Sequence, residues 1–297
     1  MTDLPTAVLC TPIDLERRAV LDLLAGHEYT DHELDGTQYR ETEYEGPKGV
    51  WKLVLAMTGR GNERAAASVE HALATWRPQI LILCGIAGGR RDARVGDIVV
   101  ATKVYGYESG QDTDTGLLQR PESLPASYPL LQRAQLVSEN QDWAAKLDGP
   151  LPRIFQRPIA SGAKVITGNH SATAELLEQS SGDAQAVDTE SFGFLAAANR
   201  RTAVEATVVR GISDLMGDKT KEADKLRQPL AARNAAAFAL ALIGRSKPKQ
   251  AEIRRLAGGT SNTYIGAIGE GATANIGAMG DHARVRMVFP GNRKDLR

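Results

Sequence analysis

The sequence predicts an α/β protein in which helices cover a mostly parallel or mixed sheet. Short apolar runs of strand length alternate with segments of helical periodicity through most of the chain. The length of 297 residues suits one large domain with a small appendage, because single cores stop growing at roughly 250 to 300 residues.

Strand and helix candidates alternate from the beginning of the chain. We expect strands at 6–10, 51–57, 80–84 and 98–104, and helices at 15–24 and 63–76. Asn62 is a plausible N-cap of the second helix. The run 80–84 is apolar throughout, as in a buried strand, and ends in a glycine cluster at 85–89. The segment 106–129 is polar and shows neither the alternation of a strand nor the apolar repeat of a helix. We therefore expect a loop, either a lid beside the site or a plain connection.

The second half of the chain continues this pattern and then changes character. Further strands are expected at 159–160, 184–187 and 206–210, and helices at 171–179, 191–199 and 221–245. Residues 246–250 have linker composition, and the near copies 265–269 and 276–280 follow in a region rich in Gly, Ala, Ile and Asn. We therefore expect one domain over 1–245 and, over 246–297, a linker with a small glycine-rich β-type unit.

Composition argues against several function classes. Lys plus Arg and Asp plus Glu both number 36, so no global field attracts nucleic acid, a membrane surface or an acidic partner. Cys10 and Cys84 lie beside apolar runs, and neither they nor the histidines show the spacing of a disulfide framework or a metal site. Neither a signal peptide nor an apolar stretch of bilayer length is found. We expect a cytoplasmic protein without metal or cofactor.

Glycine-rich and acidic motifs follow one another in a definite order. They are TGRGN (58–62), CGIAGG (84–89), VGDIVV (95–100), ASG (160–162), VDTES (187–191) and VRGISD (209–214). Each glycine motif alone supplies backbone N–H groups or close approach to a ligand, and each could equally be a structural turn. As an ordered set they resemble the nucleoside phosphorylase superfamily, nearest its methylthioadenosine/S-adenosylhomocysteine nucleosidases. The resemblance runs over roughly residues 6–244 and implies a three-layer α/β/α fold with a central mixed sheet.

The resemblance implies roles for two carboxylates. The aspartate of the I-S-D motif faces the purine N7 and matches Asp214, where an acid would assist departure of the base. The glutamate that holds the ribose hydroxyls matches Glu190, whose charge also suits an oxocarbenium-like transition state. Thr189 stands where the family has a methionine against the sugar. This difference makes the wall of the pocket beside the sugar smaller and more polar. Without the resemblance, Asp214 fits a helix N-cap and Glu190 a solvated helix start.

The sequence offers two candidates for the base that activates the attacking water. In the nucleosidases it is a glutamate just after the first strand, and the best match here is Asp14, with Glu16 next in line. Both also suit the first turn of a helix, where acidic side chains interact well with the dipole. The remaining positions that the resemblance assigns to the substrate site are Ala87, Gly88, Val165, Ile166, Ser213 and Arg210. Arg60, Arg64, Arg90 and Arg91 are further anion candidates.

The resemblance leads to a purine N-ribosyl hydrolase as the expected function. A carboxylate base favours hydrolysis over phosphorolysis, and an aspartate at the acid position goes with adenine. The polar Thr189 and the arginine-rich turns leave room for AMP, ADP or ATP as well as nucleosides. A phosphorolytic enzyme and a catalytically silent nucleoside sensor are the alternatives. We also expect a homo-oligomer, and a protein partner or assembly bound through 251–297, as in adaptor segments of bacterial conflict systems.

Overall fold

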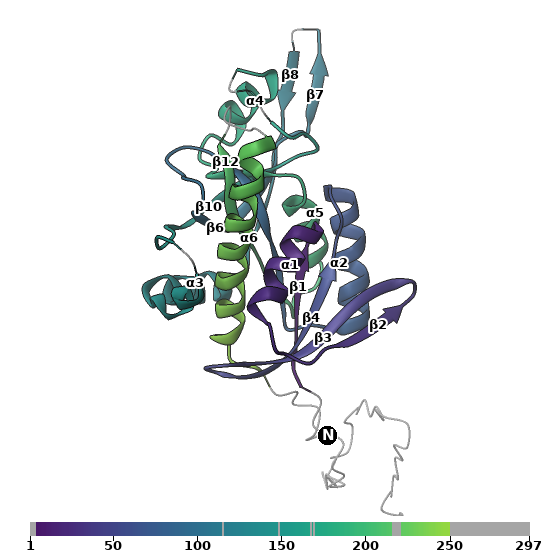
Figure 1. Cartoon of the computed structure of the whole chain (residues 1–297). Coiled ribbons are helices and arrows are strands. Elements are labelled where there is room, and N and C mark those ends of the chain that lie inside the picture. The colour runs from purple at the N-terminus through teal and green to yellow at the C-terminus, as the bar shows by residue number, and fades with distance from the viewer. Residues whose placement is uncertain are drawn as a thin grey trace, which may run out of the picture. The chain divides into compact units, whose positions relative to one another are not determined.

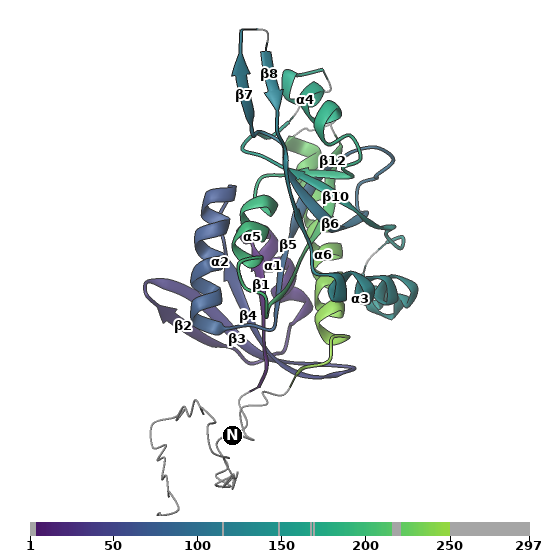
Figure 2. The same cartoon turned by 180° about the vertical axis from the view of Figure 1, so that it is seen from behind.

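The computed structural model describes residues 4–249, except 115, 148, 167, 169 and 216–220. These residues form three layers, with one mixed sheet between two layers of helices (Figures 1 and 2). The strand order is β11-β10-β6-β12-β5-β1-β4-β3-β2, and β9 pairs with β6. The predicted three-layer α/β/α fold with a central mixed sheet is therefore confirmed.

The elements are bounded as follows. The strands are β1 (Thr6–Thr11), β2 (Thr30–Leu34), β3 (Thr37–Gly46), β4 (Gly49–Met57), β5 (Ile80–Gly89), β6 (Ile98–Gly106), β7 (Gly110–Thr113), β8 (Gly116–Gln119), β9 (Glu122–Pro125), β10 (Ile154–Ser161), β11 (Ala186–Asp188) and β12 (Glu205–Leu215). The helices are α1 (Asp14–Leu23), α2 (Asn62–Trp76), α3 (Tyr128–Glu139), α4 (Ala172–Ser180), α5 (Ser191–Ala198) and α6 (Lys221–Gly244), with a 3₁₀ helix, η1 (Gln141–Lys146).

Side chains of the central strands alternate between two cores. On β1, Ala7 and Leu9 belong to the core that includes residues of α1, α3 and α6, whereas Val8 and Cys10 belong to the core that includes residues of α2 and α5. Successive strand residues point to opposite faces, so a strand covered on both faces is apolar throughout. This explains why the apolar runs of β1 and β5 were visible in the sequence.

The glycine cluster after residue 84 continues β5 and is not a turn. Ala186 and Val187 of β11 pair antiparallel with Gly89 and Gly88 of β5, while β11 also pairs in parallel with β10. The strands β5, β12, β6, β10 and β11 thereby close on themselves. This closure brings the ends of β5, β11 and β12 together.

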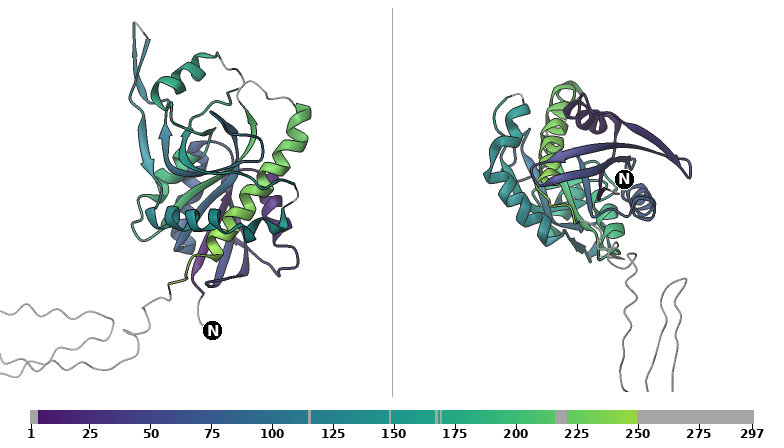
Figure 3. Two further views of the ribbon diagram at one scale, coloured as in Figure 1. Left: turned by 90° about the vertical axis from the view of Figure 1, so that its left-hand side faces the viewer. Right: turned by 90° about the horizontal axis from the view of Figure 1, so that it is seen from below.

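The predicted loop over 106–129 is wrong. Within it, β9 pairs with the end of β6, and β7 pairs with β8 in a separate ribbon that stands apart from the main sheet (Figure 3, left). The hairpin β2–β3 was also missed, because its charged residues alternate without an apolar face long enough to detect. Polar strands at an edge or outside a sheet give no hydrophobic period.

The predicted N-cap at Asn62 is also wrong. Gly61 caps α2, and Asn62 is the first helical residue. The Asn62 side-chain Oδ1 instead accepts hydrogen bonds from the backbone N–H of Gly193 (2.9 Å) and from the Ser161 hydroxyl (3.1 Å). Asn62 therefore ties α2 to α5 and β10 beside the glycine turn.

The beginning of the predicted linker is bound to the domain. The Trp51 indole donates to the carbonyl of Ser246 (3.2 Å), and the backbone N–H of Lys249 donates to the Gln79 side chain (2.9 Å). The two near copies and the rest of 251–297 lie outside the described residues. No helix in the described part of the chain combines the length and apolarity that crossing a bilayer requires.

The packing of α6 on β12 can be tested at Gly211. A Cβ added there would lie 2.0 Å from the carbonyl oxygen of Ala231 in α6, so backbone would have to move. We expect Gly211→Ala to lower the free energy of unfolding by about 1–3 kcal/mol, as overpacking does, in urea titrations. Gly168→Ala is the control, because its added Cβ meets nothing within 4 Å. A Gly211→Ala protein as stable as this control would contradict the packing.

Candidate active site

A cleft lies at the carboxyl ends of β1, β5, β11 and β12. It encloses about 770 Å³ including its open mouth. In α/β sheets, ligands bind outside the carboxyl ends of the strands. The residues that line it are Pro12, Ile13, Glu16, Arg60, Ile86, Ala87, Gly88, Lys164, Val165, Ile166, Val187, Asp188, Thr189, Glu190, Ser213, Asp214 and Gln228. With the exceptions of Asp14 and Arg210, every predicted site residue is in this set.

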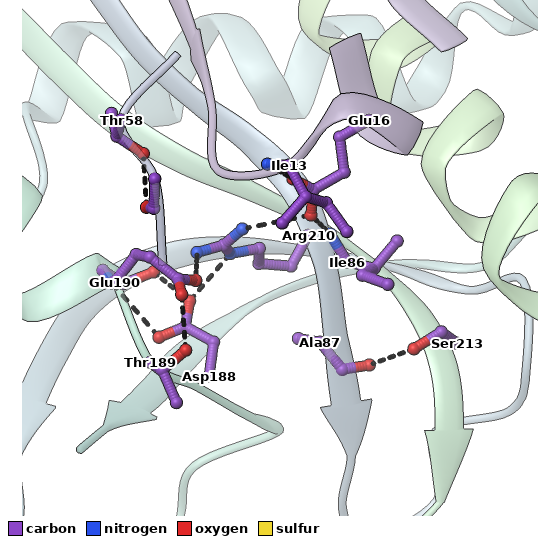
Figure 4. Close-up of polar contacts among 12 residues, drawn as sticks. Ile13, Glu16, Thr58, Ile86, Ala87, Asp188, Thr189, Glu190, Arg210 and Ser213 are labelled. Atoms are coloured by element: carbon purple, nitrogen blue, oxygen red, sulfur yellow. Dashed lines mark hydrogen bonds and ion pairs between the residues drawn. The ribbon is translucent and has the colours of Figure 1, made fainter. Parts of the chain in front are cut away.

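Arg210 of β12 lies fully buried behind the cleft, between three carboxylates (Figure 4). Its Nε donates to Asp188 Oδ2 (2.7 Å), and its Nη2 donates to Glu190 Oε2 (3.0 Å). Its Nη1 lies 3.9 Å from Glu16 Oε1 and has no hydrogen-bond partner among the described residues. Burial alone would lower the pKa of Arg210, but the three carboxylates raise it above the ordinary value. The guanidinium therefore stays charged inside the protein.

Glu16 reaches the cleft floor from α1. Its Oε2 accepts the backbone N–H of Ile13 (2.8 Å), and its Oε1 accepts that of Ile86 (2.8 Å). Burial raises the pKa of Glu16 to about 7, although Arg210 and the two N–H groups oppose the shift. A Cβ at Gly85 would lie 2.3 Å from both Glu16 Oε1 and Arg210 Nη1, so only glycine fits between this strand and the ion pair.

The structure does not bring Asp14, the best sequence match for the water base, to the cleft. Its side chain is 57% exposed and pairs with Arg18 (2.6 Å) on the outer face of α1. Residues two apart on a helix point to nearly opposite sides, so Asp14 and Glu16 cannot both face the cleft. Of the two, Glu16 is the carboxylate that lines the cleft.

Glu190 and Thr189 form the wall opposite Glu16. Glu190 Oε1 accepts the backbone N–H of Gly61 (3.1 Å) and the hydroxyl of Thr189. Asp188, a site residue that was not predicted from the sequence, accepts the backbone N–H (3.2 Å) and the hydroxyl of Ser191. Its place in the same V-D-T-E-S motif as Glu190 was the signal that could have revealed it.

A β-bulge places Asp214 at the other end of the cleft. The register between β12 and β5 shifts after Ile212, so that Ser213 is the extra residue and Asp214 lies opposite Gly88. Bulges of this kind re-aim side chains beside active sites. The Ser213 hydroxyl donates to Asp214 Oδ1 (2.7 Å), which orients the carboxyl group.

The mouth of the cleft carries exposed and positively charged side chains. Ile166 is buried, whereas Val165 is 66% exposed. Arg60 is the one predicted anion candidate that lines the cleft, together with Lys164. Arg90 and Arg91 instead bind Glu178 (2.9 and 3.1 Å), and Arg64 does not line the cleft.

In the described part of the chain, no three His, Cys, Asp or Glu side chains gather as a metal site.

Sequence comparisons identify relatives over this domain. The family model of the phosphorylase superfamily matches residues 8–244. ATP nucleosidase Cap17 of Escherichia coli strain KTE188 is 26% identical over 240 residues, which cover 73% of this chain and 47% of the relative. The 5′-methylthioadenosine/S-adenosylhomocysteine nucleosidase of Psychromonas ingrahamii is 27% identical over 226 residues, covering 72% and 84%. The chain thus spans about half the length of the Cap17 relatives.

Solved structures share the fold. The 5′-methylthioadenosine/S-adenosylhomocysteine nucleosidase of Neisseria meningitidis, in complex with methylthio-immucillin-A, superposes with a TM-score of 0.67 at 17% identity, covering 82% of this chain and all of that one (100%). Futalosine hydrolase of Helicobacter pylori gives 0.68 at 17% identity, covering 82% and 99%. The family match extends from β1 to α6 and includes every motif of the cleft. The resemblance predicted from those motifs is confirmed, and the chain belongs to the phosphorylase superfamily.

Proposed function

We propose that this chain is a nucleosidase that hydrolyses the N-glycosidic bond of adenine nucleosides and nucleotides. The observation that carries the proposal is Glu16, a buried carboxylate at the cleft floor whose pKa is raised to about 7. A general base is most effective when its pKa lies near the working pH. The sequence relatives named above are nucleosidases by name, which agrees with this chemistry.

The nucleophile would be a water that enters the cleft and donates a hydrogen bond to Glu16. Glu16 lines the cleft, whereas Arg210 lies behind it and holds a positive charge near this carboxylate. Glu16 takes the proton as this water attacks the anomeric carbon. The carboxylate of Glu190, close to the sugar, stabilises the positive charge that develops on it.

The leaving group would be protonated by Asp214. A purine anion departs poorly, so a proton delivered to N7 lowers the barrier, and a positioned acid typically contributes about 10²–10⁴-fold. The Ser213 hydroxyl orients Asp214 through Oδ1, and Asp214 Oδ2 lies 3.6 Å from the position of a Cβ added at Gly88, beside the base site. The apolar side chains of Ile166 and Val187 line the same end of the cleft and suit a purine ring.

Charge at the cleft floor favours water over phosphate as the nucleophile. Glu16, Asp188 and Glu190 surround a single guanidinium, so the cluster is negative even when Glu16 is protonated. A phosphate ion would be repelled from this position, whereas a neutral water would not. We therefore favour hydrolysis over phosphorolysis.

The cationic mouth supports nucleotides among the substrates. Arg60 precedes Gly61, whose N–H binds the sugar anchor Glu190, so Arg60 lies at the sugar end of the cleft. Arg60 and Lys164 are exposed and form no ion pair with another described residue. Both are available to a 5′-phosphate chain.

Base release from a substrate panel tests the activity. We expect mass spectrometry to detect adenine from adenosine, AMP, ADP or ATP in phosphate-free buffer, and Asp214→Asn to reduce this release by about 10²-fold or more. Asp14→Asn, on the outer face of α1, is the matched control with unchanged release. Free base from none of these compounds would overturn the enzyme proposal in favour of a sensor. Release that requires phosphate would show a phosphorylase.

The pH dependence tests Glu16. Since the base must be deprotonated, we expect kcat/KM to rise with pH through about 7, and Glu16→Gln to abolish turnover. The folded chain also binds this proton more tightly than the unfolded chain. The Glu16 contribution to the free energy of unfolding should therefore fall, on the order of 3 kcal/mol, between pH 4.5 and about 7. Urea titrations at pH 5 and pH 8 that change equally in wild type and Glu16→Gln would contradict this.

Charge removal at the mouth tests the nucleotide preference. We expect Arg60→Gln and Lys164→Gln each to lower kcat/KM for ATP about tenfold while changing that for adenosine little, because a charge-assisted hydrogen bond to phosphate is lost. Arg64→Gln removes the same charge from α2 outside the cleft and serves as the control. Equal losses for adenosine and ATP would show that these cations do not bind phosphate.

A further inference from the structure

Most hydrogen-bond acceptor positions of the Glu190 carboxylate are occupied by other groups of the protein. An ionised carboxylate offers about four lone-pair positions. Gly61 N–H (3.1 Å) and the Thr189 hydroxyl occupy both positions on Oε1, and Arg210 Nη2 (3.0 Å) occupies one on Oε2. One position is left, so Glu190 can accept one sugar hydroxyl and not two.

The nearest acceptor for a second hydroxyl is Thr189. A threonine hydroxyl has one proton and two lone pairs, and this proton is committed to Glu190, which as a carboxylate can only accept. Thr189 lines the cleft and is half-buried, so its lone pairs are within reach of a ligand. Toward the substrate its hydroxyl therefore acts purely as an acceptor.

Asp188 is the rival acceptor and is less suitable. Arg210 Nε (2.7 Å) and the hydroxyl of Ser191 occupy its Oδ2, and the Ser191 N–H (3.2 Å) occupies one position on Oδ1. Its side chain is 2% exposed, against 7% for Glu190. A sugar hydroxyl would meet Thr189 and Glu190 first.

We propose that Thr189 is a specificity-determining residue that binds one hydroxyl of the ribose cis-diol while Glu190 binds the other. The inference rests on the proposed function and adds the sugar class: the site selects ribosides over 2′-deoxy and 3′-deoxy nucleosides. Each hydroxyl has its own acceptor, so the two deoxy substrates lose different contacts. Thr189 thereby accepts a hydrogen bond directly from the sugar.

The variant Thr189→Val tests this division. Valine has the shape of threonine, and its methyl group covers the Glu190 lone pair that the hydroxyl leaves. We expect kcat/KM to fall about tenfold to a hundredfold for the riboside and for one of the two deoxyadenosines. The other deoxyadenosine lacks the hydroxyl that Thr189 binds, so its kcat/KM should not change. Thr189→Ser keeps a hydroxyl and should restore the wild-type pattern across the three substrates.

Two results would overturn the proposal. An equal loss for all three substrates would show that Thr189 acts only by holding Glu190, and no loss for any would show that it binds no hydroxyl. If wild type releases adenine from none of them, the proposed function fails instead. Calorimetric titration of the three nucleosides into wild type and Thr189→Val then tests Thr189 separately, because the same selective loss is expected in affinity and its absence would refute the inference.

Discussion

The cleft depends on one buried guanidinium. Arg210 comes from a central strand, and its three carboxylates come from α1, from the end of β11 and from the start of α5. Burying these charges is costly, and removing one partner of a buried ion pair typically costs about 3–5 kcal/mol. Elements far apart in the chain are therefore held at one point, and the carboxylate side chains of the cleft are fixed in orientation.

The backbone has to make room for this cluster. At Gly85 no Cβ fits between the strand, Glu16 and Arg210, and beyond it β5 continues until β11 pairs with Gly88 and Gly89. The bulge at Ser213 then turns Asp214 toward the same space. The glycine motif thus has two tasks, because it admits the ion cluster on one side and lets the sheet close on the other.

The sequence predicted those parts of the fold that are apolar and periodic. The central strands were recognised because burial on both faces leaves an uninterrupted apolar run, and α2 because its buried residues recur at helical spacing. The hairpin β2–β3 and the ribbon β7–β8 were missed because strands with polar side chains carry no such run. Within the site, the motifs identified Asp214 and Glu190 as cleft residues. Only the orientation of α1 shows that Glu16, and not Asp14, faces the cleft. The partner of Asp188 lies 22 residues away in sequence, so no local pattern revealed that ion pair.

The three carboxylates differ in their distance from Arg210. Asp188 and Glu190 bond Arg210 directly, at 2.7 and 3.0 Å, so that each commits an oxygen to it as an acceptor. Glu16 stays at 3.9 Å, where attraction to the guanidinium only partly offsets the cost of burial, and its pKa remains near 7. Closer approach would make Glu16 a third acceptor and a weaker base. The 3.9 Å separation therefore helps to keep the pKa of Glu16 above its ordinary value, as the proposed role of general base requires.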